Sequence, residues 1–236
     1  KIKPTKEDAD VWVVDGIKDV KADIPVVWRT DNQTLFDSEA DIVSTLQSVP
    51  RLNVVLTDVE TFNDDDFAGY KDFLEGLSAK IEQMYVDGKA SQLNILTDRM
   101  MLKEMNNCGA GDSSITLAPN GRFYVCPAFY LADEADSIGD LEHGLDIKNA
   151  QLYKLQYAPI CRHCDAWQCK RCIWLNRKMT FEVNTPSHEQ CVMAHLERNA
   201  SRELLQNIRK HGTFLPEQED IKEIDYLDPF DMRDNW

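Results

Sequence analysis

The first hundred residues alternate short apolar runs with longer stretches whose apolar residues return every three or four positions. Residues 11–14 and 25–28 are apolar runs bounded by Asp, Gly and Pro, which is typical of buried strands. Residues 36–49 have helical spacing, with Asp37 or Ser38 as the candidate cap and Pro50 after the last turn. The pattern also predicts a strand at residues 52–58 and a long helix at residues 67–85, which ends near Gly88.

Residues 93–98 nearly repeat the sequence of residues 52–58, and we predict a further strand there. A strand-and-turn phrase that recurs on both sides of a helix indicates successive βα units with parallel strands. Three or four such units are too few to close an eight-stranded barrel. The predicted fold class of this half is therefore α/β, either a partial (β/α) barrel or an open parallel sheet.

Polar residues follow two of the predicted strands. Because ligands of α/β proteins bind at the carboxyl ends of strands, these residues are candidates for substrate contact. They are Asp58, Glu60, Asp98 and Arg99. The alternative is that the Thr-Asp pairs at residues 57–58 and 97–98 cap the helices that follow them. We favour this capping interpretation because Thr and Asp are common at helix N-caps.

The second half of the chain has a different pattern. Residues 115–117 and 123–125 flank the turn sequence Pro119-Asn120-Gly121, which predicts a β-hairpin. A short helix is predicted at residues 149–155 and a long one from residue 188 to about residue 210, where Ser187 and Gln190 form a capping-box sequence. Residues 217–236 hold eight acidic and two basic residues, and the apolar residues among them predict that this acidic tail docks on the protein.

Charge and composition restrict the partners of the 236-residue chain. It has 26 basic and 41 acidic residues, a net charge of −15, so we expect it to bind neither nucleic acid nor an anionic membrane surface. No apolar run approaches the roughly 20 residues that span a bilayer, and the first residues do not lead into a signal-peptide core. We therefore expect a soluble, cytoplasmic protein. Because the chain lacks an initiator Met, we also expect it to be part of a longer one.

Seven cysteines carry the strongest chemical signal, and all of them fall between residues 108 and 191. An odd number of cysteines without a secretory signal argues against a disulfide framework and favours metal binding. We therefore divide the chain into an α/β domain at residues 1–107, a metal-binding domain at residues 108–212 and an acidic tail at residues 213–236. The seven cysteines are Cys108, Cys126, Cys161, Cys164, Cys169, Cys172 and Cys191.

Four of these cysteines form two Cys-x-x-Cys pairs within residues 161–172. A two-residue gap lets both sulfurs of a pair bind one ion or cluster, and thiols so crowded are poorly explained as ordinary core cysteines. The spacing permits zinc as well as an iron–sulfur cluster. Two four-ligand sites need eight ligands, so seven cysteines leave one position for an Asp, a His, solvent or a bound ligand.

Basic residues surround the paired cysteines, where five cations accompany a single acid, Asp165. One interpretation is that these cations offset the negative charge of a thiolate-ligated centre. The alternative is that they belong to a solvated basic loop with no such role. Cys191 falls in the first turn of a predicted helix, which favours a thiolate. The five cations are Arg162, Lys170, Arg171, Arg177 and Lys178. Three histidines near cysteines are candidate ligands, although a structural role is more common for histidine: His163, His188 and His195.

The order of the cysteines is similar to a known seven-cysteine pattern. Cys108 is followed by Gly121-x4-Cys126, then by the two Cys-x-x-Cys pairs and finally by Cys191. This arrangement resembles the SPASM domain of radical S-adenosylmethionine enzymes that modify peptides and proteins. The sequences at residues 108–111, 117–121 and 184–191 are similar to those of one SPASM-containing group, the CXXX repeat peptide maturases. The central block departs from the SPASM pattern, with gaps of four and two residues in place of five and three.

The resemblance implies two [4Fe-4S] clusters in a SPASM-like α+β domain with a β-hairpin and a long helix, preceded by a partial (β/α) barrel. It implies that Cys108, Cys126 and Cys172 hold the first cluster, and Asp112 is a nearby candidate for its fourth ligand. It implies that the second cluster is held by Cys161, Cys164, Cys169 and Cys191. The chain contains no Cys-x3-Cys-x2-Cys motif, so it would use S-adenosylmethionine only if an upstream segment supplies that site.

Two functions follow as hypotheses. The leading one is a peptide maturase, or a portion of one, that acts on a ribosomally made precursor peptide and carries auxiliary clusters. The alternative is a non-catalytic scaffold, stapled by zinc or by clusters, that binds the precursor peptide or a partner maturation enzyme. Without the S-adenosylmethionine motif, the sequence leaves open whether the chain is an enzyme.

Overall fold

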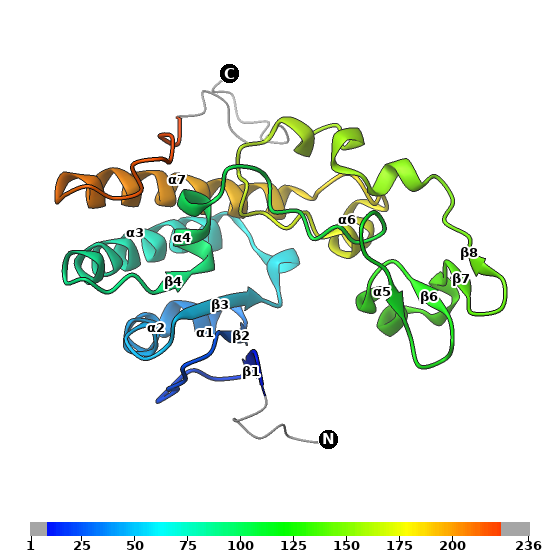
Figure 1. Ribbon diagram of the computed structural model, residues 1–236, viewed down its shortest axis with the longest axis horizontal. Coiled ribbons are helices and arrows are strands. Elements are labelled where there is room, and N and C mark those ends of the chain that lie inside the picture. Colours follow the sequence, from blue (N-terminus) through cyan, green and yellow to red (C-terminus); the bar gives the residue numbers. More distant parts are fainter. Residues whose placement is uncertain (1–8, 223–236) are drawn as a thin grey trace.

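A computed structural model describes residues 9–222 of the protein. Its largest feature is an open sheet of four parallel strands in the order β1-β2-β3-β4 (Figure 1). The expected parallel βα units are present from β2 to β4, whose connections contain helices, whereas the connection from β1 to β2 contains none. The strands are β1 (Trp12–Val14), β2 (Val26–Thr30), β3 (Arg51–Leu56) and β4 (Gln92–Leu93).

The helices of this half follow the strands and cover the sheet. The helix expected within residues 36–49 is confirmed with Ser38 at its N-cap position, although it ends at Leu46 and a separate short helix that was not expected precedes it. The side chain of Asp31 caps this short helix by accepting the N–H of Thr34 at 2.8 Å. The elements are α1 (Asn32–Asp37), α2 (Glu39–Leu46), the 3-10 turn η2 (Val59–Thr61) and α3 (Asp64–Val86).

The strand expected at residues 93–98 is also wrong, because pairing stops at Leu93 and helix α4 (Asn94–Met101) begins at once. The side chain of Asn94 takes over the backbone partners that a longer strand would have used. Its Oδ1 accepts the N–H of Val54 at 2.8 Å, and its Nδ2 donates to the Val54 carbonyl at 2.9 Å. Thr97 Oγ1 accepts the N–H of Leu93 at 2.9 Å, so the first turn of the helix is satisfied locally.

The long helix α7 (His188–Lys210) packs along α3 and α4, and its first turns follow directly on the cysteine-rich segment (Figure 1). Its buried residues, such as Met193 and Leu204, belong to the same hydrophobic core as β2, β3 and α3. The domain boundary at residues 107 and 108 stays a prediction, but α7 joins the two halves across it. Ile221 of the acidic tail is buried in this core, whereas residues 223–236 lie outside the described residues.

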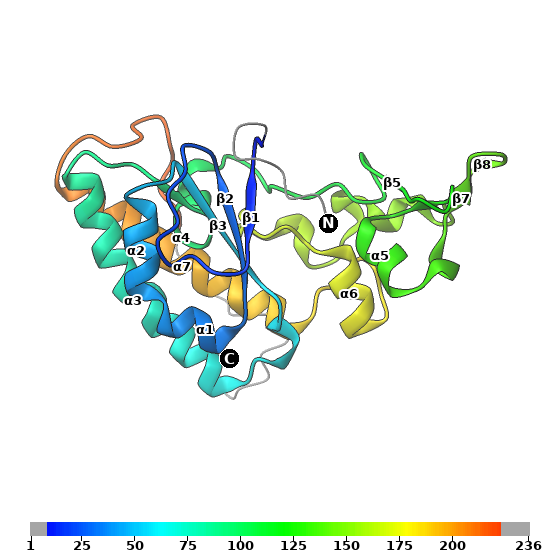
Figure 2. The ribbon, with the colours of Figure 1, turned by 90° about the horizontal axis from the view of Figure 1, so that it is seen from below.

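The cysteine-rich segment lies to one side of the sheet and is made of short elements (Figure 2). The predicted hairpin at Gly121, whose φ of 78° suits glycine, is confirmed. The helix expected at residues 149–155 is replaced by two 3-10 turns. The elements are β5 (Thr116–Leu117), β6 (Phe123–Tyr124), α5 (Pro127–Ala132), η3 (Glu134–Asp136), β7 (Gly139–Asp140), β8 (Gly144–Leu145), η4 (Ala150–Tyr153), η5 (Leu155–Tyr157), η6 (Cys161–His163) and α6 (Ile173–Thr180).

Within residues 9–222, no helix combines the length and the apolar character that crossing a membrane requires.

Candidate metal centre

Four of the seven cysteines line one cavity of about 240 Å³. They come from separate parts of the chain: Cys161 from η6, Cys164 and Cys169 from the loop after it, and Cys191 from the first turn of α7. We call these four residues the cavity group. They are the same four that the SPASM resemblance implies for the second cluster, so the fold brings that predicted set to one place.

The loop after η6 is shaped by its own backbone and by α7. The N–H of Cys164 donates to the carbonyl of Cys161 at 3.1 Å, and the N–H of Ala166 donates to Cys164 Sγ at 3.4 Å. The side chain of Gln168 donates to the carbonyl of Ala194 in α7 at 2.7 Å. The loop therefore presents its thiols while it is fastened to the helix that carries the fourth one.

The start of α7 places Cys191 at the cavity. The predicted cap Ser187 is confirmed, since its Oγ accepts the N–H of Gln190 at 3.3 Å. The other half of the expected capping box is wrong, because the Gln190 side chain donates to Asn176 Oδ1 at 2.9 Å instead of returning to the cap. Cys191 donates its own N–H to the Ser187 carbonyl at 3.2 Å, which fixes it in the first turn.

Burial shifts three thiols of the cavity group, those of Cys161, Cys164 and Cys169, toward their protonated form. It raises the pKa of Cys161 to about 11 and that of Cys169 to about 12, with a smaller contribution from the neighbouring thiols. Burial also raises the pKa of Cys164, although the N–H of Ala166 opposes the shift. At neutral pH these thiols keep their protons unless a cation replaces them, because a metal must displace the protons when it binds.

Arg171 is the one of the five expected cations that lines the cavity, and its side chain is 1% exposed. Arg177 pairs with Asp136 at 2.7 Å and Lys178 pairs with Glu60, so both act away from the cavity. Arg162 and Lys170 are exposed. The sequence therefore identified the right segment as basic, but four of its five cations do not line the cavity.

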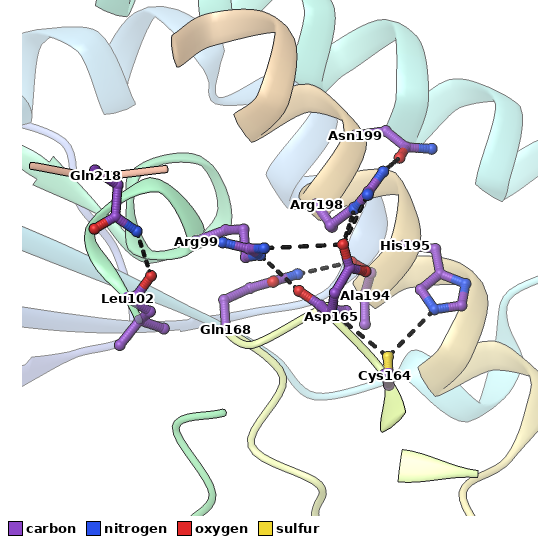
Figure 3. A network of polar contacts seen from close by, with 11 residues as sticks. Arg99, Leu102, Cys164, Asp165, Gln168, Ala194, His195, Arg198, Asn199 and Gln218 are labelled. Carbon is purple, nitrogen blue, oxygen red and sulfur yellow. Dashed lines mark hydrogen bonds and ion pairs between the residues drawn. The ribbon is translucent and has the colours of Figure 1, made fainter. Parts of the chain in front are cut away.

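Two arginines from other helices face the loop after η6, residues 164–172, which we call the cavity loop (Figure 3). Arg99 was expected only as a strand-end residue, and Arg198 was not expected at all. Arg198 of α7 donates to Asp165 Oδ2 through Nε at 3.0 Å and Nη2 at 2.7 Å. Arg99 of α4 donates to the Asp165 carbonyl at 2.6 Å and stacks over the Trp167 ring, 3.9 Å from its centroid. Both arginines lower the pKa of the adjacent Cys164, although its burial outweighs them. In the sequence around the paired cysteines, Asp165, the single acid among five cations, was the only sign that these two contacts exist.

The three candidate histidines separate clearly. His195 lines the cavity, and its Nε2 is 3.5 Å from Cys164 Sγ. His163 is exposed, and His188 contacts the Phe67 ring at a centroid distance of 6.0 Å. Only His195 is therefore placed to act on the cavity group.

The other three cysteines, Cys108, Cys126 and Cys172, are near one another, and we call them the surface group. The sulfur of Cys172 is desolvated although the residue as a whole is exposed, and this desolvation raises its pKa, as do Cys126 and Cys108. The candidate fourth ligand Asp112 lies 4.0 Å from the amine of Lys154. None of the seven cysteines, all within residues 9–222, is in a disulfide.

The polar residues expected at strand ends have structural partners. Asp58 Oδ2 accepts the N–H of Asn32 at 3.1 Å, without capping η2. Asp98 lies inside α4 and pairs with Arg51 at 2.7 Å. Glu60 and Arg99 make the contacts described above. The favoured capping interpretation is therefore wrong for the side chains of the two aspartates. Each of the four residues instead contacts a residue of another segment of the chain.

The donor chemistry of the cavity group fits an iron–sulfur cluster. Four soft thiol donors line one cavity together with Arg171, whose Nη1 is buried and finds no acceptor among the described residues. Across residues 9–222, no three Cys, His, Asp or Glu side chains converge closely enough to hold a single metal ion.

Comparison with known proteins adds no assignment. No family model matches the chain, and a search of curated proteins finds no significant match. The fold and the site alone define the molecule as an α/β protein with a cysteine-rich segment that gathers its thiols into two groups.

Proposed function

We propose that the chain is an iron–sulfur-binding peptide maturase, or a portion of one, that acts in the cytoplasm on a ribosomally made precursor peptide. One observation carries the proposal: the cavity group comes from separate segments and lines a single cavity. Its members are the residues that the SPASM pattern assigns to one cluster. The link to peptide modification rests on that resemblance.

The shape of the site favours a polynuclear cluster over zinc. A structural zinc ion needs four ligands that meet at one point, with Zn–S distances of about 2.3 Å. The thiols of the cavity group instead surround about 240 Å³. A [4Fe-4S] cluster, which takes one thiolate on each of its irons, matches four donors spread around a volume.

Each part of the site then has a role. The cavity group holds one cluster, and the surface group with Asp112 holds the other. Arg171 inside the cavity, and Arg99 and Arg198 behind Asp165, offset negative charge. When bound, such clusters relay single electrons or ligate a thiol-bearing peptide through an iron that lacks a protein ligand. The radical step itself is not assigned to this chain, which has no Cys-x3-Cys-x2-Cys motif.

Anaerobic purification with iron and sulfide analysis tests the cluster assignment. We expect a brown protein with about eight irons and eight acid-labile sulfides per chain, the content of two [4Fe-4S] clusters. Cys169→Ser and Cys126→Ser each remove a ligand of a different group, so each should lose about half of the iron. A colourless protein with stoichiometric zinc contradicts the assignment.

A synthetic peptide of Cys-x3 repeats tests the peptide assignment separately. We expect it to alter the electron paramagnetic resonance spectrum of the reduced wild-type protein in a saturable way. The matched control is the same peptide with every Cys replaced by Ser, which should leave the spectrum unchanged. A cluster-loaded protein that responds to neither peptide contradicts the peptide part of the proposal while the cluster part stands.

A further inference from the structure

Arg171 lies in the chain between Cys169 of the cavity group and Cys172 of the surface group. Its side chain is 1% exposed, and it lines the cavity. The guanidinium is within electrostatic range of Cys161 and Cys169 from one group and of Cys108 from the other. A buried cation therefore sits among thiols of both groups.

The guanidinium is held in a fixed position by two other segments. Nη2 donates to the carbonyl of Tyr153 in η4, and Nε donates to Asn107 Oδ1 at 3.5 Å. Tyr153 in turn packs on the loop after Cys108, because a Cβ at Gly111 would come within 2.5 Å of its ring. Arg171 thus fastens the loop of the surface group to the loop of the cavity group.

The position is held at a cost to the backbone. Arg171 has a φ of 47°, in the left-handed region that residues with a side chain rarely adopt. The third guanidinium nitrogen, Nη1, is buried and has no acceptor among residues 9–222. A strained residue with an unsatisfied buried donor is costly unless a ligand completes it.

We propose that Arg171 is a positioning residue shared by the two thiol groups, and that its Nη1 donates to a sulfide of the cluster in the cavity. The inference rests on the proposed function and names the residue that couples its two sites. A fixed N–H donor and positive charge beside a cluster favour its reduced form, which carries one more negative charge. Removing this fixed donor and its charge, or replacing it with a flexible ammonium that no longer holds the charge in this position, should therefore make the reduction potentials of both clusters more negative.

The test compares Arg171→Met and Arg171→Lys with Lys170→Met, which removes an exposed cation one residue away. We expect Arg171→Met to lose at least half of the iron and acid-labile sulfide after anaerobic reconstitution. We expect Arg171→Lys, which keeps the charge but lacks the planar fork, to load fully and to show more negative potentials at both clusters. Lys170→Met should match the wild type in both measurements.

The outcomes separate this inference from the proposed function. A wild-type chain without iron and sulfide overturns the proposed function and the inference with it. A cluster-loaded wild type whose Arg171→Met and Arg171→Lys variants equal Lys170→Met in loading and in potential overturns the inference alone. If Arg171→Met does not fold, the test rests on the reduction potentials of the two clusters in Arg171→Lys. Wild-type potentials at both clusters overturn the inference, and more negative potentials at both clusters support it.

Discussion

The α/β region, made of residues 9–107 with α7, and the cysteine-rich region, residues 108–187, are built on cores of very different size. Within the described part of the chain, 28 buried residues of the first region form its core together with Ile221, and six form that of the second. The strands of the cysteine-rich region are two residues long. So little apolar burial offsets little conformational entropy, and we therefore predict that this region depends on the proposed inorganic centre whereas the α/β region does not.

Removing the metal should have the largest effect and should act on one region only. We expect an iron chelator to abolish the hydrogen-exchange protection of amides in residues 108–187, because the thiols would lose the centre that joins them. Amides of α3 should keep their protection. Equal protection in residues 108–187 before and after iron removal contradicts the contrast between the regions.

A cavity in the apolar core should weaken the other region by a smaller amount. Leu77 on α3 has 0% exposure, so Leu77→Ala should lower the free energy of unfolding by about 3 kcal/mol in urea titrations. The exposed Glu75→Ala on the same helix should change it by less than about 0.5 kcal/mol. Iron and sulfide per folded chain should stay at the wild-type level, and a loss of both would show that the regions are not independent.

The contact between the regions should respond to loss of Arg198, which is 1% exposed and holds Asp165 of the cavity loop. Arg198→Met leaves Asp165 with Arg99 at 3.8 Å, so we expect a loss of about 2 kcal/mol, less than for a fully buried pair. Arg177→Met, which removes an exposed pair with Asp136, is the control and should cost at most about 1 kcal/mol. Equal unfolding curves for the two variants would refute a stabilising role for the Asp165 contact.

The pH dependence of stability should report on Glu197, which α7 places between the regions. Burial raises its pKa from the usual 4.5 to about 7, although Tyr70 and Gln168 donate hydrogen bonds that oppose the shift. A raised carboxyl pKa favours the folded state below pH 4.5, and this advantage is lost as pH rises to about 7. Its size is about 1 to 2 kcal/mol after allowance for partial exposure. Glu197→Gln should flatten this part of the profile, whereas Glu203→Gln, exposed on the same helix, should not.

The smallest expected effect is a gain of stability in the cysteine-rich region. Phe181 ends α6 with a φ of 62° and is 88% exposed, so its side chain strains the backbone and contributes little packing. Phe181→Gly should raise the free energy of unfolding of this region by about 0.5 to 1 kcal/mol. Phe181→Ala keeps a Cβ and should give no gain, and a gain equal to that of glycine would exclude strain as the reason.

Local patterns predicted much of the fold, whereas the two thiol groups were implied by the SPASM resemblance. Three features could be predicted because each depends on residues a few positions apart: helix α3, the hairpin at Gly121 and the Ser187 cap. The strand at residues 93–98 was not, because Asn94 ends the pairing through Val54 on a strand some 40 residues earlier. The similar sequences at residues 52–58 and 93–98 have the same local preference for a strand, and only the contact with the neighbouring strand distinguishes them.

By itself, the sequence determined which residues are candidates for the chemistry: the spacing of the cysteines and the excess of nearby cations depend only on order along the chain. Tertiary structure decided which of those residues meet. It brought α7 against α3, turned Arg99 and Arg198 toward Asp165, and buried Arg171 while Lys170 stayed exposed. Charge and polarity are properties of single residues, whereas burial and partnership arise only when segments distant in the chain compete to pack against one another.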